Sequence, residues 1–346
     1  MAMQEKKITK AFVFGKFMPF HKGHEAMINF ALSHCDFLSV LICCSDEETL
    51  SCALRKSWME ATFRDHPRIN IRTFQYDEKV LPNTSVSSTS VSAIWSERFK
   101  QLFPDYSLVV TSEPYGDMVA DYMGIQHIPF DISKNLYPVS ATHIRADLFK
   151  SWEYLPDSVK ASLVTKVVLL GTESTGKTTL TGKLSAYFNS SAVMEAGRDL
   201  IPDSHHFSVA DLYLVAREHA ACIQQMETGP SPLVIIDTDI HITASYGVYA
   251  LGEMLAIDPA IYAANKADLY LYLNNDVPYV QDGTRLSEAE RDLLDQSHRQ
   301  VLKQYDIAYE EITGDWEARF QQAEALINQL LQRKITAWHT RTLPSY

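Results

Sequence analysis

A glycine-rich loop near the middle of the chain constrains the fold most. The apolar run 168–170 leads into residues 171–178, which match the pattern G-x-x-x-x-G-K-[ST], and a helical pattern follows from about Lys177. Between a strand and a helix, such a loop points its backbone N–H groups into one concavity that holds the phosphates of a nucleotide. The predicted ATP-binding residues are Gly171, Glu173, Ser174, Thr175, Gly176, Lys177, Thr178 and Thr179.

Length and charge limit what surrounds this loop. A chain of 346 residues is long enough for two domains, and a hydrophobic fraction of 46% gives each a sizeable core. The formal net charge of -12 argues against a general nucleic-acid-binding surface. No apolar run reaches a membrane span and no signal-peptide pattern begins the chain, so we expect a soluble, cytoplasmic protein without membrane or nucleic-acid partners. A homo-oligomer is compatible with the sequence.

The five cysteines show no metal-binding or C-x-x-C spacing. We expect reduced thiols, with Cys43 and Cys44 packed inside a strand.

The first half of the chain alternates strand-like and helical patterns. Strand-like runs occupy residues 11–15, 38–43, 69–74, 108–111 and 125–130. This alternation predicts an α/β domain with a parallel sheet that is covered by helices on both faces. Ligands bind such sheets at the carboxyl ends of the strands. There, His21 and His24 lie in a strand-to-helix turn that suits a phosphate chain, with Gly23 allowing close backbone approach.

A second polar segment closes this half. Ser140 and Thr142 stand at a helix start and Arg145 follows one turn later. By itself this segment is either a helix cap with a surface arginine or a second anion site.

Together these two segments resemble the nucleotidylyltransferase superfamily. Residues 15–24 resemble its G-x-F-x-P-x-H-x-G-H signature, and residues 140–145 resemble its I-S-x-T/A-x-x-R motif. Members join a nucleotide to a phosphate-bearing acceptor and release pyrophosphate. The resemblance implies a first-domain ATP site, whose residues are Gly15, Lys16, Phe17, His21, Gly23, His24, Ser140, Thr142 and Arg145.

The resemblance extends to one family over nearly the whole chain. Residues 13–17, 95–96, 115–124, 152–156 and the P-loop resemble the bifunctional nicotinamide mononucleotide adenylyltransferase and ribosylnicotinamide kinase, the NadR family. Some members carry an N-terminal helix-turn-helix, for which we expect no room here. The resemblance also implies that Trp95 stacks on the nicotinamide ring; core packing is the alternative for a lone tryptophan.

The second half predicts a nucleoside-kinase-like P-loop fold. Strand-like runs occupy 191–195, 233–237 and 269–273, and a terminal packing helix covers about 315–334. Asp237 ends an apolar run in the manner of a Walker B strand, so Thr178 and Asp237 are the predicted Mg²⁺ ligands.

Phosphoryl transfer to a ribose hydroxyl also needs a base and cations. Glu195 is the predicted base, with a salt bridge to Arg198 as the alternative, and Asp239 is the second choice. Arg285 and Arg291 are expected lid arginines, and exposed helix arginine is the alternative for Arg291. Glu195, Arg198, Asp239 and Tyr279 are the predicted riboside-binding residues.

These features predict two domains, 1–155 for adenylyl transfer and 156–346 for kinase chemistry. The expected enzyme phosphorylates nicotinamide riboside with ATP and then adenylylates nicotinamide mononucleotide to NAD, using Mg²⁺. One alternative keeps the folds and changes the acceptors. Another is an NAD-sensing regulator with weak turnover, against which the intact His21, His24, Lys177 and Asp237 weigh.

Overall fold

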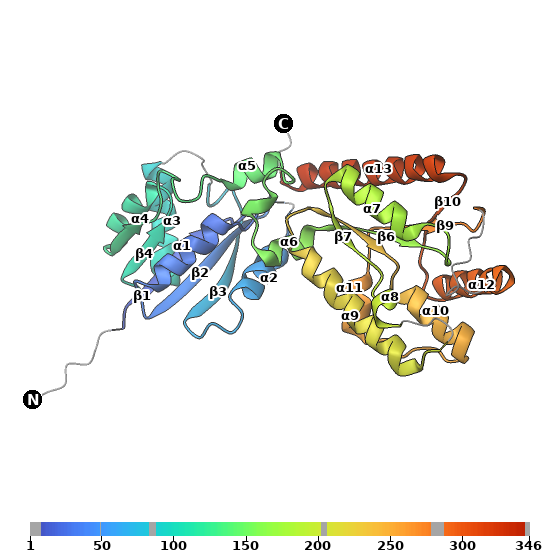
Figure 1. Cartoon of the computed structure of the whole chain (residues 1–346). Coiled ribbons are helices and arrows are strands. Elements are labelled where there is room, and N and C mark those ends of the chain that lie inside the picture. The colour runs from blue at the N-terminus through green and yellow to red at the C-terminus, as the bar shows by residue number, and fades with distance from the viewer. Residues whose placement is uncertain (1–7, 49, 83–87, 202–205, 278–286, 343–346) are drawn as a thin grey trace, which may run out of the picture. The chain divides into compact units, whose positions relative to one another are not determined.

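The computed structural model describes residues 8–48, 50–82, 88–201, 206–277 and 287–342, which form two compact units. Unit 1 consists of Met1–Val159 with Thr336–Tyr346, and unit 2 consists of Lys160–Ile335 (Figure 1). Each unit contains one five-stranded parallel sheet, which confirms the predicted fold class. Within the described residues, no helix is long and apolar enough to cross a membrane.

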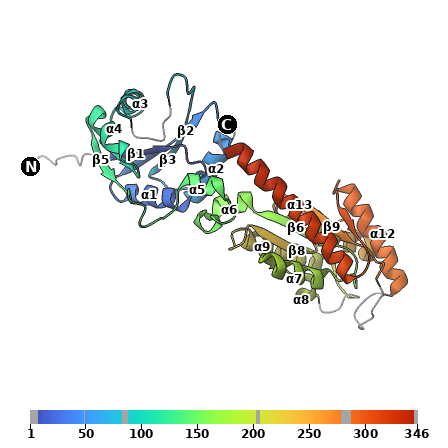
Figure 2. The ribbon, with the colours of Figure 1, turned by 90° about the horizontal axis from the view of Figure 1, so that it is seen from above.

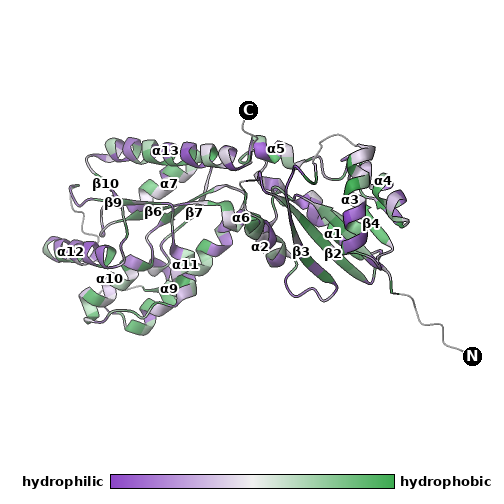
Figure 3. Cartoon of the chain, turned by 180° about the vertical axis from the view of Figure 1, so that it is seen from behind, coloured by the Kyte–Doolittle hydropathy of each residue, from purple (hydrophilic) through white to green (hydrophobic). Residues whose placement is uncertain are grey.

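The sheet of unit 1 has the strand order β3-β2-β1-β4-β5. Its strands are β1 (Lys10–Gly15), β2 (Phe37–Ser45), β3 (Ile69–Tyr76), β4 (Leu108–Thr111) and β5 (Gln126–Pro129). In β2, eight of nine residues are buried, as expected for a parallel strand that is covered on both faces. Figure 3 shows these strands as largely hydrophobic.

A helix follows each of the first four strands, so every crossover between parallel strands is helical. The helices and one 3₁₀ turn are α1 (Lys22–Leu32), α2 (Cys52–Thr62), α3 (Thr89–Leu102), α4 (Tyr115–Met123), α5 (Ala141–Ala146), η1 (Trp152–Tyr154) and α6 (Asp157–Leu163). Figure 2 shows α3 and α4 on one side of the sheet and α1 on the other. Aromatic rings fill the α3 side, where Phe12 stacks on Phe103 with ring centroids 4.5 Å apart.

The sheet of unit 2 has the order β10-β9-β6-β8-β7. Its strands are β6 (Thr165–Leu170), β7 (Ser191–Val193), β8 (Leu233–Asp237), β9 (Leu269–Leu273) and β10 (Glu310–Ile312). The sequence analysis missed β10, because it has three residues and only Ile312 is buried.

Seven helices are assigned to the described part of the chain from β6 onward. They are α7 (Lys177–Phe188), α8 (Gly197–Leu200), α9 (Val209–Glu227), α10 (Ile240–Leu251), α11 (Pro259–Asn265), α12 (Glu288–Gln304) and α13 (Trp316–Thr342). Buried residues of α7 and α13 share one apolar cluster with β6, β8, β9 and β10, so these two helices cover one face of the sheet. The terminal helix was predicted, and it continues past the expected end at 334.

In both sheets the central strand is the first in sequence, and strand order reverses beside it. The carboxyl end of that strand is therefore the expected binding position in each unit. The histidine turn follows β1, and the P-loop follows β6.

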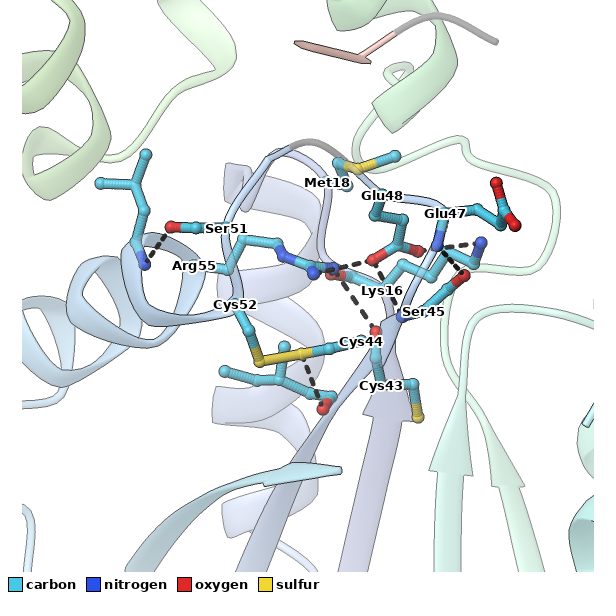
Figure 4. Close-up of polar contacts among 12 residues, drawn as sticks. Lys16, Met18, Cys43, Cys44, Ser45, Glu47, Glu48, Ser51, Cys52 and Arg55 are labelled. Atoms are coloured by element: carbon cyan, nitrogen blue, oxygen red, sulfur yellow. Dashed lines mark hydrogen bonds and ion pairs between the residues drawn. A yellow bond between two sulfur atoms is a disulfide. The ribbon is translucent and has the colours of Figure 1, made fainter. Parts of the chain in front are cut away.

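The cysteines differ from expectation in one pair. Cys44 at the end of β2 and Cys52 at the start of α2 form a disulfide (Figure 4), with their Cα atoms 5.8 Å apart. The expectation of reduced thiols is therefore wrong for this pair, whose spacing matches no cysteine motif; Cys35, Cys43 and Cys222 are free. Cys43 and Cys44 are buried in β2, as predicted.

Candidate functional sites

The histidine turn of unit 1 links β1 to α1. His21 is the N-cap residue of α1, and its Nδ1 accepts a hydrogen bond from the backbone N–H of Gly23 at 3.1 Å. Because Nδ1 is the acceptor, the neutral ring carries its proton on Nε2 and can donate it to a ligand. The ring of His24 stacks on that of His21, with centroids 3.6 Å apart. A Cβ on Gly23 would lie 3.0 Å from the His21 ring, so a larger residue would press on this arrangement.

Both histidines are neutral near neutral pH. Burial, with a smaller contribution from Lys134, lowers the pKa of His21 to about 3. Burial also holds the pKa of His24 well below its usual value, and the neighbouring His21 and Lys134 lower it further. Nδ1 of His24 is buried and has no hydrogen-bond partner among the described residues. The pair therefore offers ring N–H groups, not full charges, to an incoming anion.

A pocket of about 200 Å³ opens at the carboxyl ends of β1 and β4. Among its lining residues are five from the predicted ATP site, namely Gly15, Lys16, Phe17, His24 and Arg145. Thr111, Ser112 and Glu113 at the end of β4 also line it, and the sequence analysis missed them. The signal available was their position at the end of a strand that neighbours β1.

The second motif starts α5 and reaches the histidine turn. Ser140 caps this helix, since its hydroxyl accepts from the backbone N–H of His143 at 3.2 Å. Arg145 donates to Thr142 Oγ1 at 2.9 Å and to the backbone oxygen of Met18 at 2.8 Å. Burial lowers the pKa of Arg145, and Glu48 opposes this shift. The motif thus combines the helix cap with a pocket-lining cation, where the sequence left the two as alternatives.

An ion-pair network surrounds Lys16 (Figure 4). Lys16 Nζ lies 2.9 Å from Glu48 Oε1 and 3.3 Å from Glu78 Oε1. Arg55 from α2 pairs with Glu48 Oε2 at 2.7 Å and donates to the backbone oxygen of Lys16 at 2.8 Å. The side chains of Arg55 and Glu48 are 1% and 5% exposed. The sequence analysis missed both, because nothing local marks Arg55 as buried.

Trp95 lies in α3 within the aromatic core. Its Nε1 donates to the backbone oxygen of Pro82 at 3.1 Å, and the Tyr76 ring packs edge-on at 4.9 Å between centroids. Trp95 is buried and does not line the pocket beside Lys16. The structure thus favours the packing alternative for this residue.

The P-loop of unit 2 has the backbone that its glycines allow. Gly171 and Gly176 have φ values of +133° and +86°, and a Cβ on Gly171 would lie 2.6 Å from the backbone oxygen of Leu273. Lys177 is buried, and its Nζ donates to the backbone oxygen of Thr172 at 2.9 Å. Helix α7 begins at Lys177, as predicted, so its positive dipole end lies at the loop.

The two predicted metal ligands lie together. Thr178 Oγ1 donates to Asp237 Oδ2 at 2.6 Å, and Asp237 is fully buried at the end of β8. A hydroxyl and a carboxylate oxygen are the donors that a hard divalent cation prefers. The described residues include no group of three or more His, Cys, Asp or Glu side chains that could hold a metal. A metal here would thus complete its shell with phosphate oxygens and water.

The two candidate bases differ in their surroundings. Glu195 follows β7, and its Oε2 lies 3.4 Å from Arg198 Nε, which is the salt bridge considered as its alternative role. Asp239 is fully buried and caps α10, accepting from the backbone N–H groups of His241 and Ile242. Its Oδ2 also pairs with His241 Nδ1. Both oxygens of Asp239 therefore already have partners within the fold, which favours Glu195 as the base.

Tyr246 of α10 is a residue that the sequence analysis assigned to core packing. Its hydroxyl donates to Oε1 of Glu173 in the P-loop at 3.1 Å. Burial raises the pKa of Tyr246 well above its usual value, and the nearby Glu173 and Glu195 add to the shift. Tyr246 is thus bonded to the P-loop and lies within the electrostatic influence of the candidate base Glu195. Its helical context gave no sign of this, because aromatic residues at this spacing also pack cores.

Arg291 of α12 is 3% exposed and donates to the backbone oxygen of Asn275 at 3.3 Å. Its burial excludes the alternative of an exposed helix arginine. The other predicted lid arginine, Arg285, and the predicted riboside-binding residue Tyr279 lie outside the described residues.

Comparisons with known proteins agree with this two-site arrangement. A protein family described as an AAA domain matches residues 166–319. The trifunctional NAD biosynthesis/regulator protein NadR of Salmonella typhimurium is 28% identical over 92% of this chain and 82% of its own length. The protein of that name from Escherichia coli is 28% identical over 94% of this chain and 84% of its own.

Solved structures share the fold. The crystal structure of a NadR protein in complex with NAD and AMP-PNP matches with a TM-score of 0.58 and 19% identity, over 98% of this chain and 97% of the other. A NadR protein in complex with NR matches with a TM-score of 0.57 and 18% identity, over 97% of each chain.

Fold and sites together define a two-unit α/β transferase with one nucleotidylyltransferase-type turn and one P-loop. The similarity to the two curated relatives extends over 92% and 94% of this chain and therefore includes both units. The chain is similar to the NadR proteins of Salmonella typhimurium and Escherichia coli over both units.

Proposed function

We propose that this chain is a bifunctional NAD salvage enzyme. Unit 2 phosphorylates nicotinamide riboside with ATP to give nicotinamide mononucleotide and ADP. Unit 1 transfers the adenylyl group of a second ATP to nicotinamide mononucleotide, which gives NAD and pyrophosphate. In this proposal residues 1–155 and 156–346 are the two functional domains, the partners are these small molecules, and the location is cytoplasmic, where ATP is available.

One observation carries the proposal. A single chain places two different phosphate-binding turns at the carboxyl ends of the central strands of two parallel sheets. The relatives that match both units together are named for NAD biosynthesis, and one similar structure was solved with NR. Two consecutive reactions on one nicotinamide compound account for both turns.

Unit 1 has to align two anions and stabilise charge. The attacking phosphate of nicotinamide mononucleotide is already ionised, so attack on the α-phosphorus of ATP needs no general base. Neutral His21 and His24 donate N–H groups to the ATP phosphates, and Lys16 adds a cation. We assign Arg145 to the leaving pyrophosphate, together with Ser140 and Thr142.

Unit 2 has to move a phosphoryl group to the 5′-hydroxyl of the riboside. Lys177 and the P-loop backbone hold the ATP phosphates, and we assign Glu195 to accept the hydroxyl proton. Thr178 and Asp237 would hold Mg²⁺, which neutralises charge on the β- and γ-phosphates when bound. We assign Arg291 to the developing charge on the transferred group.

The remaining predicted residues keep narrower assignments. Arg198 orients Glu195. Asp239 caps α10 and thereby fixes the start of that helix beside the riboside site. Arg285 and Tyr279 stay proposed contacts of the lid and the nicotinamide ring.

The test uses the purified full-length chain with nicotinamide riboside, ATP and Mg²⁺, followed over time by chromatography. We expect mononucleotide first and then NAD. Mononucleotide without NAD would overturn the assignment of unit 1. If uridine is phosphorylated in preference to nicotinamide riboside when both are present, the proposed acceptor of unit 2 is wrong. If neither riboside nor added mononucleotide reacts, the chain is a regulator with weak turnover and the proposal fails.

A further inference from the structure

Trp316, the first residue of α13, lies against the P-loop. A Cβ placed on Gly176 would lie 2.2 Å from Cζ3 of the Trp316 ring, so the indole edge packs directly on the backbone of this loop glycine. The Trp316 side chain is nevertheless 51% exposed. The four other tryptophans of the chain are all buried, namely Trp58, Trp95, Trp152 and Trp338.

Arg319 holds this corner of the unit together. Its guanidinium is buried and donates to the backbone oxygens of Thr175 at 2.9 Å, Asn274 at 2.7 Å and Gly314 at 2.8 Å. These acceptors belong to the P-loop and to the segments after β9 and β10. The guanidinium carbon also lies 5.9 Å from the centroid of the Trp316 ring. The indole is thereby attached to the loop through a fixed set of contacts.

The strand order gives the bound nucleotide a direction. In the order β10-β9-β6-β8-β7, the candidate metal ligand Asp237 ends β8 and the candidate base Glu195 follows β7. Both lie on one side of the P-loop strand β6, so the transferred end of the phosphate chain points to that side. The sugar and base of the nucleotide must then extend from the P-loop toward β9 and β10. Trp316 follows β10 and lies on that side.

We propose that the exposed face of Trp316 stacks on the purine base of the ATP whose phosphates the P-loop holds. Arg319 is a positioning residue that fixes the ring relative to the loop. The inference rests on the proposed kinase function and adds a determinant of which nucleoside triphosphate unit 2 accepts. A flat indole face binds a nucleobase by stacking on the π face of the base, and a phosphate group without a base has no such face.

The first experiment measures KM for ATP in the kinase reaction. Loss of base–aromatic stacking in Trp316→Ala should raise KM by about 5- to 100-fold with a smaller change in kcat. Trp316→Phe keeps a ring and should stay close to the unsubstituted protein. The matched control is Tyr187→Ala, which removes a 57% exposed ring from the far end of α7 and should leave KM unchanged. Kinase turnover at saturating ATP by the same preparations reports on the folding of unit 2.

The second experiment does not need turnover. Trp316 is the one exposed tryptophan, so the fluorescence difference between the unsubstituted protein and Trp316→Phe isolates its signal. ADP should quench that signal, whereas inorganic tripolyphosphate, which has no base, should not. Equal quenching by both compounds, or a KM for Trp316→Ala equal to that of the unsubstituted protein, would overturn the inference. A failed riboside assay with intact ADP quenching would instead count against the proposed kinase substrate alone.

Discussion

Replacing Arg55 by methionine tests whether a buried ion pair in unit 1 sets the position of Lys16. The guanidinium of Arg55 is 1% exposed and pairs with the 5% exposed carboxylate of Glu48 at 2.7 Å. It also donates to the backbone oxygens of Lys16 and Cys43. Removing one partner of a buried pair leaves an uncompensated charge and costs about 3–5 kcal/mol. Because Lys16 Nζ still lies 2.9 Å from Glu48, we expect the lower end, about 3 kcal/mol.

The consequence for catalysis follows from geometry. Arg55 holds the backbone of Lys16 in the turn that leads to His21, so its loss should let the Lys16 ammonium leave the phosphate position. We expect adenylyl transfer to fall at least about tenfold, as when a transition-state donor is misplaced. Kinase activity should be unchanged, because every contact of Arg55 described above lies within unit 1.

The assay is a urea titration in which residual adenylyl transfer and residual kinase activity are measured in the same samples. Arg55→Met should lower the midpoint for the first activity only. Arg55→Met/Glu48→Gln removes the stranded charge and should recover part of the stability, which a double-mutant cycle measures. Arg64→Met, which removes an exposed arginine just beyond α2, is the matched control. If Arg55→Met keeps both its midpoint and its turnover, the argument from the buried pair is refuted.

Three further outcomes are expected. His24→Ala should lower adenylyl transfer at least ~100-fold through loss of a phosphate donor, with kinase turnover in the same sample as control; near-normal transfer would exclude the assignment. Thr178→Ala should raise the free Mg²⁺ concentration needed for half-maximal kinase rate, because Asp237 and the phosphates keep the remaining ligands, and an unchanged Mg²⁺ dependence would remove Thr178 from the metal shell. Folding lowers the pKa of His21 from 6.5 to about 3, so between these values only the unfolded chain takes up the proton. His21 should therefore contribute a decrease in the unfolding free energy of unit 1 of about 1.4 kcal/mol per pH unit below pH 6.5, and His21→Gln should remove that contribution in urea titrations.

The sequence predicted those parts of the fold that local patterns encode. Strands such as β2 and β8 are runs of apolar residues long enough to stand out, and the P-loop carries its own spacing. The placement of Thr178 beside Asp237 was also predictable, because a Walker-type strand end and the P-loop threonine have a fixed relation in such folds. Strand β10 was not predictable from the sequence, because Glu310 and Glu311 are exposed and Ile312 is its only buried residue.

Contacts between distant segments were beyond the sequence. Arg55 follows β2 by a short loop, yet nothing in its helix distinguishes it from the half-buried Lys56 beside it. Arg319 bonds to Thr175 across 144 positions, and the helix that carries it has the pattern of a packing helix. A hydrophobic period shows which face of a helix is buried. It does not show which charged residue at the end of that face reaches a functional loop.

The two phosphate turns hold positive charge in different ways, and this difference fits their chemistry. Lys177 donates to a neutral backbone oxygen, so its full charge is available to the phosphates of ATP. Lys16 lies between the carboxylates of Glu48 and Glu78, and the adjacent histidines are neutral. A kinase acts on an uncharged hydroxyl and has one polyanion to neutralise. Adenylyl transfer brings two anions together, and this turn meets them with buried ring N–H donors and one ion-paired cation.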